Sequence, residues 1–318
     1  MKHLLFCCLM LFCVTTLHAQ PPAFLAIGTD ARAEALGGTQ LGTAPAAMSL
    51  FANPAQTAGL PGLQAQTTMT QWIADISQYG GAVTLGLRHG GTLGLTGIWM
   101  DYGSFTRTAT TAASRDGYTM DGTFSVAEYA LGLAYAQPIA ARLSLGAHLQ
   151  YAAQQLPQTD AAAGNATTHQ VVMTMGTVYQ PGWKQLRLGA HLQQGGLAQA
   201  APPETNPHHQ WMLSGALDLM AFLPGTGLAR MSDLTLAYDR VRTFDQPLRQ
   251  HLGLEYALHE VLFLRSGYRV GYEQQGLTAG LGVRMPVGDT ALQVDYAYSD
   301  FGTYFGSVHR FGFGVGLR

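Results

Sequence analysis

The chain has little charge, little cysteine and, after its first residues, no long apolar run. Charged residues make up 11% of its 318 positions, under half of the roughly 25% usual in soluble domains. A soluble domain of this size with so few charges would expose much apolar surface. The net charge of −2 gives no electrostatic reason to expect a nucleic acid as partner.

All three cysteines, Cys7, Cys8 and Cys13, lie near the start of the chain. The same stretch has a basic residue at Lys2 and an apolar run from Leu4 to Val14, and it ends on small residues before Gln20. This order is typical of a secretory signal peptide, and we assign it to residues 1–19. The mature chain is then predicted to have no disulfide, no reactive thiol and no cysteine metal site.

After residue 20 no apolar stretch approaches the roughly 20 residues of a membrane-spanning helix. The chain is nevertheless exported and apolar, and it contains 39 glycines. A closed β-barrel is the other structure that satisfies its own backbone inside lipid.

Period two is the dominant pattern of the mature sequence. From Leu292 to Ser299 every even position is large and apolar, and Leu143, Leu145 and Leu149 alternate with Ser144, Gly146 and His148 in the same way. A soluble β-sandwich would show the same alternation, but the polar positions here are mostly glycine, alanine and serine, which favours a barrel. About 14 segments are expected, beginning near Leu63, Tyr79, Thr92, Thr123, Ala141, Thr168, Lys184, His208, Asp233, Arg249, Val261, Gly276, Ala291 and Phe305.

The predicted fold is therefore all-β, a transmembrane antiparallel up-and-down barrel formed by residues 63–318. Short turns alternate with longer links at Gly103–Gly122, Gln154–Thr167 and Gly195–Pro207, so we expect both termini on the periplasmic side. The length of Phe222–Ser232, on that same side, has no explanation in the pattern. We expect the barrel to lie in the outer membrane of a Gram-negative cell, with its lipid as the first partner.

Charged residues within the strands are expected to face the lumen, because a charge facing lipid costs up to several kcal/mol. Two interpretations stay open, a constriction that binds a solute or plug, and ion pairs that fill the interior. The candidate lumen-lining residues are Arg88, Arg187, Arg265, Arg269, Arg284 and Asp295.

Residues 20–62 are too long to be only a tail, and we expect them to fold into the periplasmic mouth as a plug. The alternative is a loosely ordered periplasmic strap. Asn53 and Pro54 are expected to form a turn that caps backbone groups. The candidate plug motif comprises Arg32, Gly37, Gly38, Asn53 and Pro54.

No residue pattern points to a catalytic, metal or cofactor site. The Gly280 and Gly312–Gly316 runs keep a period of two, so they belong to strands and not to nucleotide-binding loops. His208 and His209 have no third ligand at metal spacing, and the loop acids show no triad spacing to a histidine. We expect neither an enzyme nor a cofactor.

Several short motifs resemble the PorV/PorQ family, which is related to FadL-type transporters. Residues Ala31–Gly38, ARAEALGG, and the Asn53-Pro54-Ala55 element lie before the barrel as they do in that family. The stretch from Asp101 to Leu131 is most similar to PorQ, and the stretch from Arg265 to Phe311 is similar to PorV-type proteins. The chain departs from the family at Thr43-Ala44-Pro45, where acidic residues often stand, and at Arg318, where an aromatic residue usually ends the chain.

The resemblance implies an accessory component of type IX protein secretion or cell-surface attachment, with other secretion proteins or cargo as partners. The alternative is a FadL-like channel for hydrophobic or small solutes. Solute uptake would indicate a channel, and co-purification with secretion proteins would indicate an accessory component.

Overall fold

The computed structural model describes residues 22–88, 90–111, 115, 117–157, 165–194, 209–222, 231–243 and 246–317. The expected signal peptide, residues 1–19, and the expected link 195–207 lie outside these residues.

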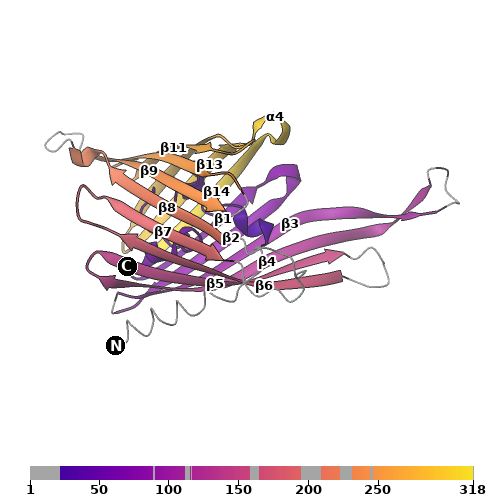
Figure 1. Cartoon of the computed structure of the whole chain (residues 1–318), viewed down its shortest axis with the longest axis horizontal. Helices are drawn as coiled ribbons and strands as arrows, with labels where there is room; N and C mark the ends of the chain where they lie inside the picture. Colours follow the sequence, from indigo (N-terminus) through magenta and orange to yellow (C-terminus); the bar gives the residue numbers. More distant parts are fainter. Residues whose placement is uncertain are drawn as a thin grey trace.

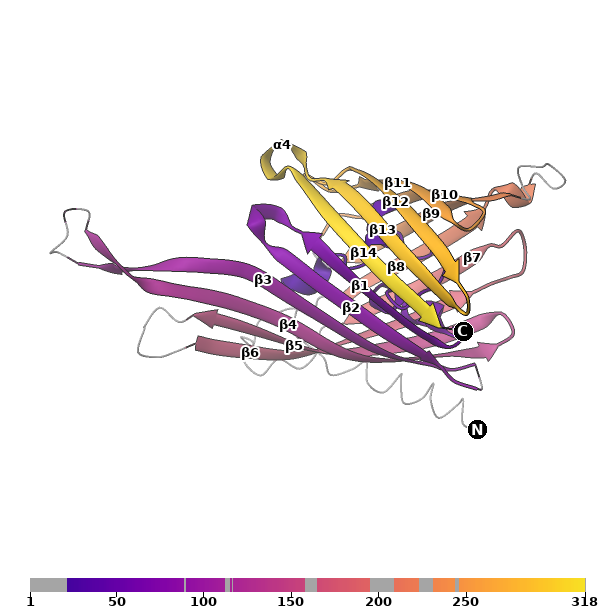
Figure 2. The same cartoon turned by 180° about the vertical axis from the view of Figure 1, so that it is seen from behind.

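Fourteen antiparallel strands form one closed barrel (Figures 1 and 2). Each strand pairs with its neighbours in sequence, and β1 pairs with β14 from Leu63↔Leu317 to Gln71↔His309. The strands are β1 (Leu63–Gln71), β2 (Ser77–Gly86), β3 (Thr92–Thr110), β4 (Tyr118–Ala140), β5 (Leu143–Pro157), β6 (Asn165–Tyr179), β7 (Arg187–Gln194), β8 (His209–Asp218), β9 (Ser232–Thr243), β10 (Arg249–Leu258), β11 (Leu262–Val270), β12 (Leu277–Val287), β13 (Thr290–Asp300) and β14 (Ser307–Leu317).

The prediction of about 14 strands in an up-and-down barrel is confirmed. Three strands begin at the expected residue, Leu63, Thr92 and Arg249. The largest difference is at β4, which begins at Tyr118 and not at Thr123.

The alternation places apolar side chains on the outside of the barrel. In β11 every second residue from Leu262 is exposed, and the residues between them are buried. Leu131 and Leu133 are 63% and 65% exposed, which in water would be an unfavourable arrangement along a whole strand. The sheet therefore turns its apolar face to lipid, and the sandwich alternative is excluded. Among the described residues no helix is long and apolar enough to span a membrane.

Two strands continue far beyond their neighbours. The expected link Gly103–Gly122 is mostly strand, because β3 continues to Thr110 and β4 begins at Tyr118. Irregularities in the β3–β4 register fall between Asp101 and Ser104 and between Thr106 and Thr108. The expected link Gln154–Thr167 is also shorter than predicted, since β5 reaches Pro157 and β6 starts at Asn165. Both predictions of long loops were wrong at these positions.

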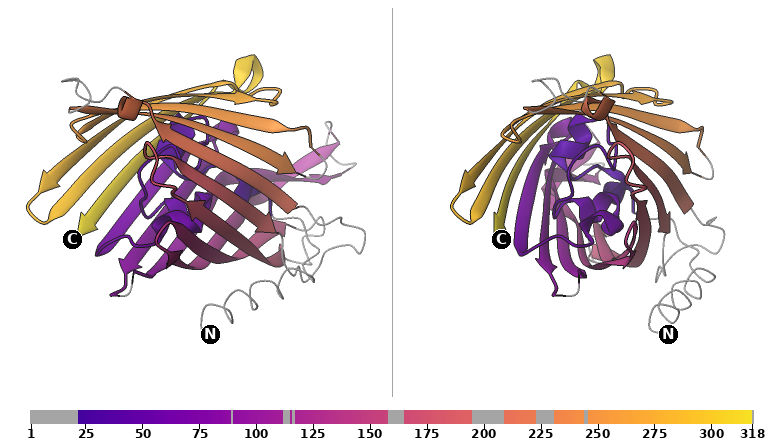
Figure 3. Two further views of the ribbon diagram at one scale, coloured as in Figure 1. Left: turned by 60° about the vertical axis from the view of Figure 1, so that its left-hand side comes forward. Right: turned by 90° about the vertical axis from the view of Figure 1, so that its left-hand side faces the viewer.

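The segment before β1 lies inside the ring of strands (Figure 3). It contains four short helices: η2 (Ala23–Ala26), α2 (Ala31–Ala35), α3 (Ser49–Ala52) and η3 (Pro54–Thr57). Leu36, Leu41 and Leu50 are at most 1% exposed. The other described helices are in connections: η4 (Ile73–Asp75), η6 (Met220–Phe222) and α4 (Gly302–Phe305).

Local chemistry explains where two of these short helices begin and end. The Asp30 carboxylate accepts a hydrogen bond from the Arg32 amide at 2.9 Å and caps α2. Gly37 and Gly38, with φ of 74° and 84°, end α2 in a conformation that favours glycine. The Asn53 side chain accepts from the Ala55 amide and caps η3.

Candidate functional site

Glycines on the inner face of the barrel let the N-terminal segment come close to the wall. A Cβ added at Gly146 would lie 2.5 Å from the Pro54 carbonyl carbon, and one added at Gly280 would lie 2.5 Å from Ala35 Cβ. At Gly267 an added Cβ would overlap the backbone between Leu36 and Gly37. The glycine-rich inner face is therefore shaped to the backbone of this segment.

The buried carboxylate of Glu34 joins the N-terminal segment to β11 and β14. Glu34 of α2 is 6% exposed, and its Oε2 lies 2.6 Å from Arg269 Nη2 of β11 and 3.0 Å from Arg310 Nη2 of β14. Burial alone would raise the pKa of Glu34, but Arg269 and Arg310 overcome that effect and lower it to about 2. Glu34 is therefore ionised at neutral pH and forms an ionic contact with both arginines.

A second ionic cluster belongs to the wall alone. Arg265 is 4% exposed and donates to Glu255 Oε2 and to Asp295 Oδ1, both at 2.7 Å. Asp295 also accepts from Gln293 Nε2 at 2.8 Å, and Gln293 Oε1 accepts from Arg284 at 3.0 Å. These side chains pair with one another across β10–β13.

Two arginines hold the segment between α2 and α3 through its backbone. Arg32 Nη2 donates to the Ala44 carbonyl at 2.9 Å, and Arg187 Nη1 donates to the Thr43 carbonyl at 3.0 Å. The backbone N–H of Gln40 donates to Asp239 Oδ2 at 2.7 Å. The segment is therefore attached by polar groups to β7, β9, β11 and β14.

The structure places the candidate residues as follows. Arg265, Arg269 and Asp295 are buried on inner faces of strands, and Arg187 and Arg284 are half-buried there. Arg88 differs, because it lies in the turn after β2 and is exposed. Arg32 and Asn53 are 2% and 0% exposed within the segment, and Asn53 Nδ2 also donates to the Thr177 carbonyl of β6.

Sequence reasoning missed two residues of this interior, Glu34 and Arg310. Glu34 lies in the ARAEALGG motif and Arg310 lies in a strand of clear alternation. Glu34 itself was a usable signal, because an acid that is buried in a mostly apolar segment requires a cationic partner.

A different part of the segment meets the wall through apolar groups. Phe24 packs with Ile98 and Met100 of β3, Ala130 of β4 and Ala152 of β5, all at most 4% exposed. Leu25, Ile27, Phe51, Ile76 and Tyr102 pack around them. We call these ten residues the apolar seam. It lies toward the barrel end opposite Leu63 and Leu317, and at its edge the Tyr102 hydroxyl donates to Glu128 of β4, which is buried.

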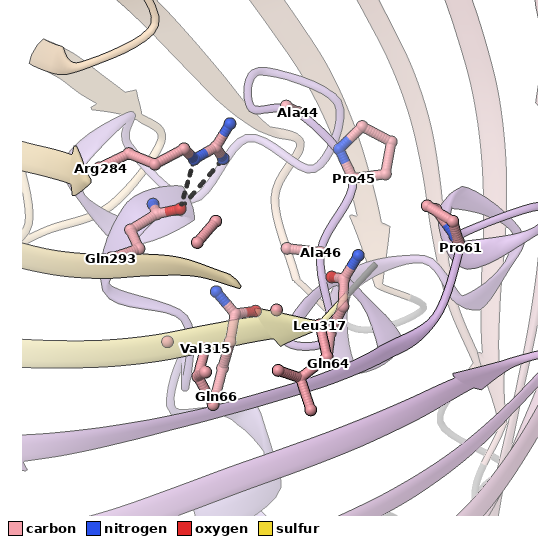
Figure 4. Close-up of a pocket in the computed structure, with 13 residues that line it drawn as sticks. Ala44, Pro45, Ala46, Pro61, Gln64, Gln66, Arg284, Gln293, Val315 and Leu317 are labelled. Carbon is pink, nitrogen blue, oxygen red and sulfur yellow. Dashed lines mark hydrogen bonds between the residues drawn. The ribbon is translucent and has the colours of Figure 1, made fainter. Parts of the chain in front are cut away.

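The end of the interior nearest Leu317 is lined by polar side chains. A cavity of about 200 Å³ lies between the segment at Ala44–Ala46 and the ends of β1, β12, β13 and β14 (Figure 4). Gln64, Gln66, Gln293 and Arg284 line it. This end is thus polar, whereas the seam toward the other mouth is mostly apolar.

This fold and this apolar outer surface define an outer-membrane β-barrel, and solved structures agree. The toluene transporter TodX of Pseudomonas putida aligns with a TM-score of 0.55 and 10% identity, over 91% of this chain and 96% of that one. The toluene transporter TbuX of Ralstonia pickettii gives 0.55 and 12%, over 92% and 99%. A FadL homologue of Pseudomonas aeruginosa gives 0.53 and 10%, over 91% and 98%.

The chain therefore has the fold of FadL-type barrels. No family model matches the sequence, and no curated protein matches it. The comparisons give no support to the finer resemblance to PorV/PorQ or to the role in type IX secretion.

Proposed function

We propose that this protein is an outer-membrane channel for small apolar molecules, and that its N-terminal segment is the plug. The apolar seam is the observation that carries the proposal. Two of the similar structures, TodX and TbuX, are toluene transporters, which agrees with this proposal. All the similar structures named above are transporters or transporter homologues, which favours a role without catalysis.

The seam differs chemically from the rest of the interior. Polar solutes would lose hydration against Ile98, Met100 and Phe24 without gaining hydrogen bonds, whereas an apolar solute loses nothing there. Burial of apolar surface contributes about 25 cal/mol per Å², so an apolar molecule can replace the contacts that it displaces.

The attachment of the segment is also uneven. Its ion pairs and charged hydrogen bonds are to β7, β9, β11 and β14. Its contacts with β3, β4 and β5 include the packing of the seam and an uncharged hydrogen bond from Thr92 Oγ1 of β3 to the Thr57 carbonyl at 2.7 Å. Packed apolar contacts impose little direction and separate without leaving an unpaired charge. We therefore place the passage along the seam, between the segment and β3–β5.

Uptake in cells that carry the protein tests this proposal. Met100→Gln introduces an amide into the seam, and Met100→Leu is the matched control that keeps it apolar at similar volume. We expect uptake of radiolabelled toluene to fall about tenfold in Met100→Gln and to stay near normal in Met100→Leu. A toluene molecule in the seam would cover the glutamine amide without pairing it, which costs about 1–3 kcal/mol. If cells with the wild-type protein take up no more toluene than cells without it, the proposal is contradicted.

Accessory action in protein secretion is the second candidate. Its support is the order of the short motifs, from Ala31–Gly38 to the region near Phe311. Affinity purification from native membranes tests it, and recovery without any secretion component would remove it.

A further inference from the structure

A two-stranded ribbon projects from the barrel at the end opposite Leu63 and Leu317. β2 pairs with β3 only as far as Ser77↔Asp101, and β5 pairs with β4 only from Gln155↔Ala127. Residues 102–110 and 118–126 therefore pair with each other alone. Nine residues at about 3.3 Å each extend roughly 30 Å, and Figures 1 and 2 show this hairpin reaching well past its neighbours. We call it the β3–β4 ribbon.

Within the described residues, neither long edge of the ribbon has a strand beside it. An isolated two-stranded hairpin is marginally stable in water, and its edges present unpaired N–H and C=O groups. Some stiffness comes from within, since Phe105 and Phe124 stack at 5.4 Å and Arg107 lies 5.9 Å from the Phe124 ring.

The free groups on the β3 edge can be assigned. The Thr111 amide donates to the Gly117 carbonyl at 3.0 Å, so Thr111 faces β4. The register from Thr110↔Tyr118 to Thr108↔Met120 is regular. Because the backbone alternates sides along an antiparallel strand, Thr110 and Thr108 direct their N–H and C=O groups to the free edge.

The outer part of the ribbon has little that protects its edges. Proteins commonly block an open edge with lysine, proline, an inward charge or a β-bulge. The register irregularities of the ribbon lie before Thr108, and residues 102–110 and 118–126 contain no lysine and no proline and only two charged residues, Arg107 and Asp121. Five of these residues are threonine, and Phe105, Tyr118 and Met120 are 43%, 46% and 76% exposed. Such an edge suits a β-branched or apolar strand and offers little to a charged ligand.

A second copy of this chain does not fit the edge well. Two copies in one membrane share an orientation, so their β3 strands both run outward, and a two-fold contact between them pairs the strands in parallel. Parallel pairing is less stable per residue. Antiparallel pairing of β3 with β4 of another copy is head-to-tail, so it ends only where the rotation between copies closes a ring.

We propose that the β3–β4 ribbon is a docking edge for an extended strand of another polypeptide at the cell surface. The strand adds antiparallel to β3, bonds to the backbone of Thr108 and Thr110, and lays its side chains beside those of β3, Phe105 among them. Strand addition of this kind takes its affinity from backbone hydrogen bonds. The proposal does not depend on transport through the barrel.

Proline at the edge tests the proposal without breaking the ribbon. Thr108→Pro with Thr110→Pro removes two outward N–H groups and is tolerated on an edge strand, while Thr108→Val with Thr110→Val keeps both. The probe is a fluorescent peptide of alternating threonine and valine with lysine at each end, and its binding to the protein in nanodiscs is followed by anisotropy. We expect saturable binding to wild type and to the valine variant, and binding about 30-fold weaker to the proline variant, from two lost hydrogen bonds.

The same peptide with alternate amides N-methylated is the control ligand and should not bind. Absence of saturable binding to wild type, or equal binding to the proline variant, would overturn the proposal. The mass of the detergent-solubilised protein gives a further check. A dimer that the proline variant abolishes would make a second copy the occupant and overturn the assignment. Unchanged heat-modifiable mobility on gels shows that both variants still form the barrel.

Discussion

Replacing Glu34 with glutamine should release the N-terminal segment from the wall of the barrel. The change removes the one carboxylate that lies between Arg269 and Arg310 and leaves two buried guanidinium groups without it. The pKa of Glu34 is about 2 in place of 4.5, and this shift corresponds to about 3 kcal/mol of stabilisation of the attached segment. Removal of one partner of a buried pair costs a similar amount, about 3–5 kcal/mol.

A change of about 3 kcal/mol is roughly a 100-fold change in the equilibrium between attached and detached segment. Single-channel recording in planar bilayers measures it directly, because a detached segment leaves the lumen less filled. We expect openings to be rare for wild type and frequent for Glu34→Gln. The segment should also become sensitive to protease at low protease concentration, while the barrel stays intact.

Glu273→Gln is the matched control, because Glu273 is an exposed acid in the connection between β11 and β12. It should leave both readouts unchanged. If Glu34→Gln gives the same open fraction and the same protease resistance as wild type, the ionic contact does not hold the segment and the reasoning fails.

Three further outcomes follow from the same structure. The attachment of the segment by Glu34 is fully stabilising above about pH 4.5 and is lost as pH falls through about 2, because the pKa of Glu34 is lowered in the folded protein. Channel openings should therefore increase between pH 5 and pH 2 in wild type and not in Glu34→Gln. Gly267→Ala should expose the segment to protease at a cost of about 1–3 kcal/mol, whereas Gly97→Ala, whose added Cβ has its nearest neighbour at 3.8 Å, should not. Arg265→Gln leaves Glu255 and Asp295 unpaired and should lower the free energy of unfolding in urea by about 3–5 kcal/mol, while Arg240→Gln at an exposed position should change it little.

The strands were predictable because lipid imposes the alternation. Within the bilayer every second side chain must be apolar, so β11 and β13 show a strict period of two. The β3–β4 ribbon extends beyond the strands that pair with β3 and β4. Its alternation fades although the backbone remains extended, so alternation alone predicts a loop at Gly103–Gly122. Threonine and aromatic propensity was the remaining signal there.

The interior was less predictable than the wall. Glu34 pairs with Arg269 and Arg310, which follow it by more than 200 residues, and no local pattern specifies such a contact. Arg88 was predicted to line the lumen but lies in a turn. The reason is related, because alternation does not mark where a strand ends. Glu255, Arg265 and Asp295 lie on β10, β11 and β13, and their pairing depends on the register of these strands and of β12 between them.

The position of α2 has a consequence for the order in which the molecule is assembled. This helix comes early in the chain, yet it contacts β11, β12, β13 and β14, the last four strands. Its docking surface does not exist until the C-terminal strands have been added, and β14 must also complete the pairing with β1. During assembly a part of the chain that comes early in the sequence must therefore wait for the part that comes last, and enclosure of the segment and closure of the wall belong to one final step.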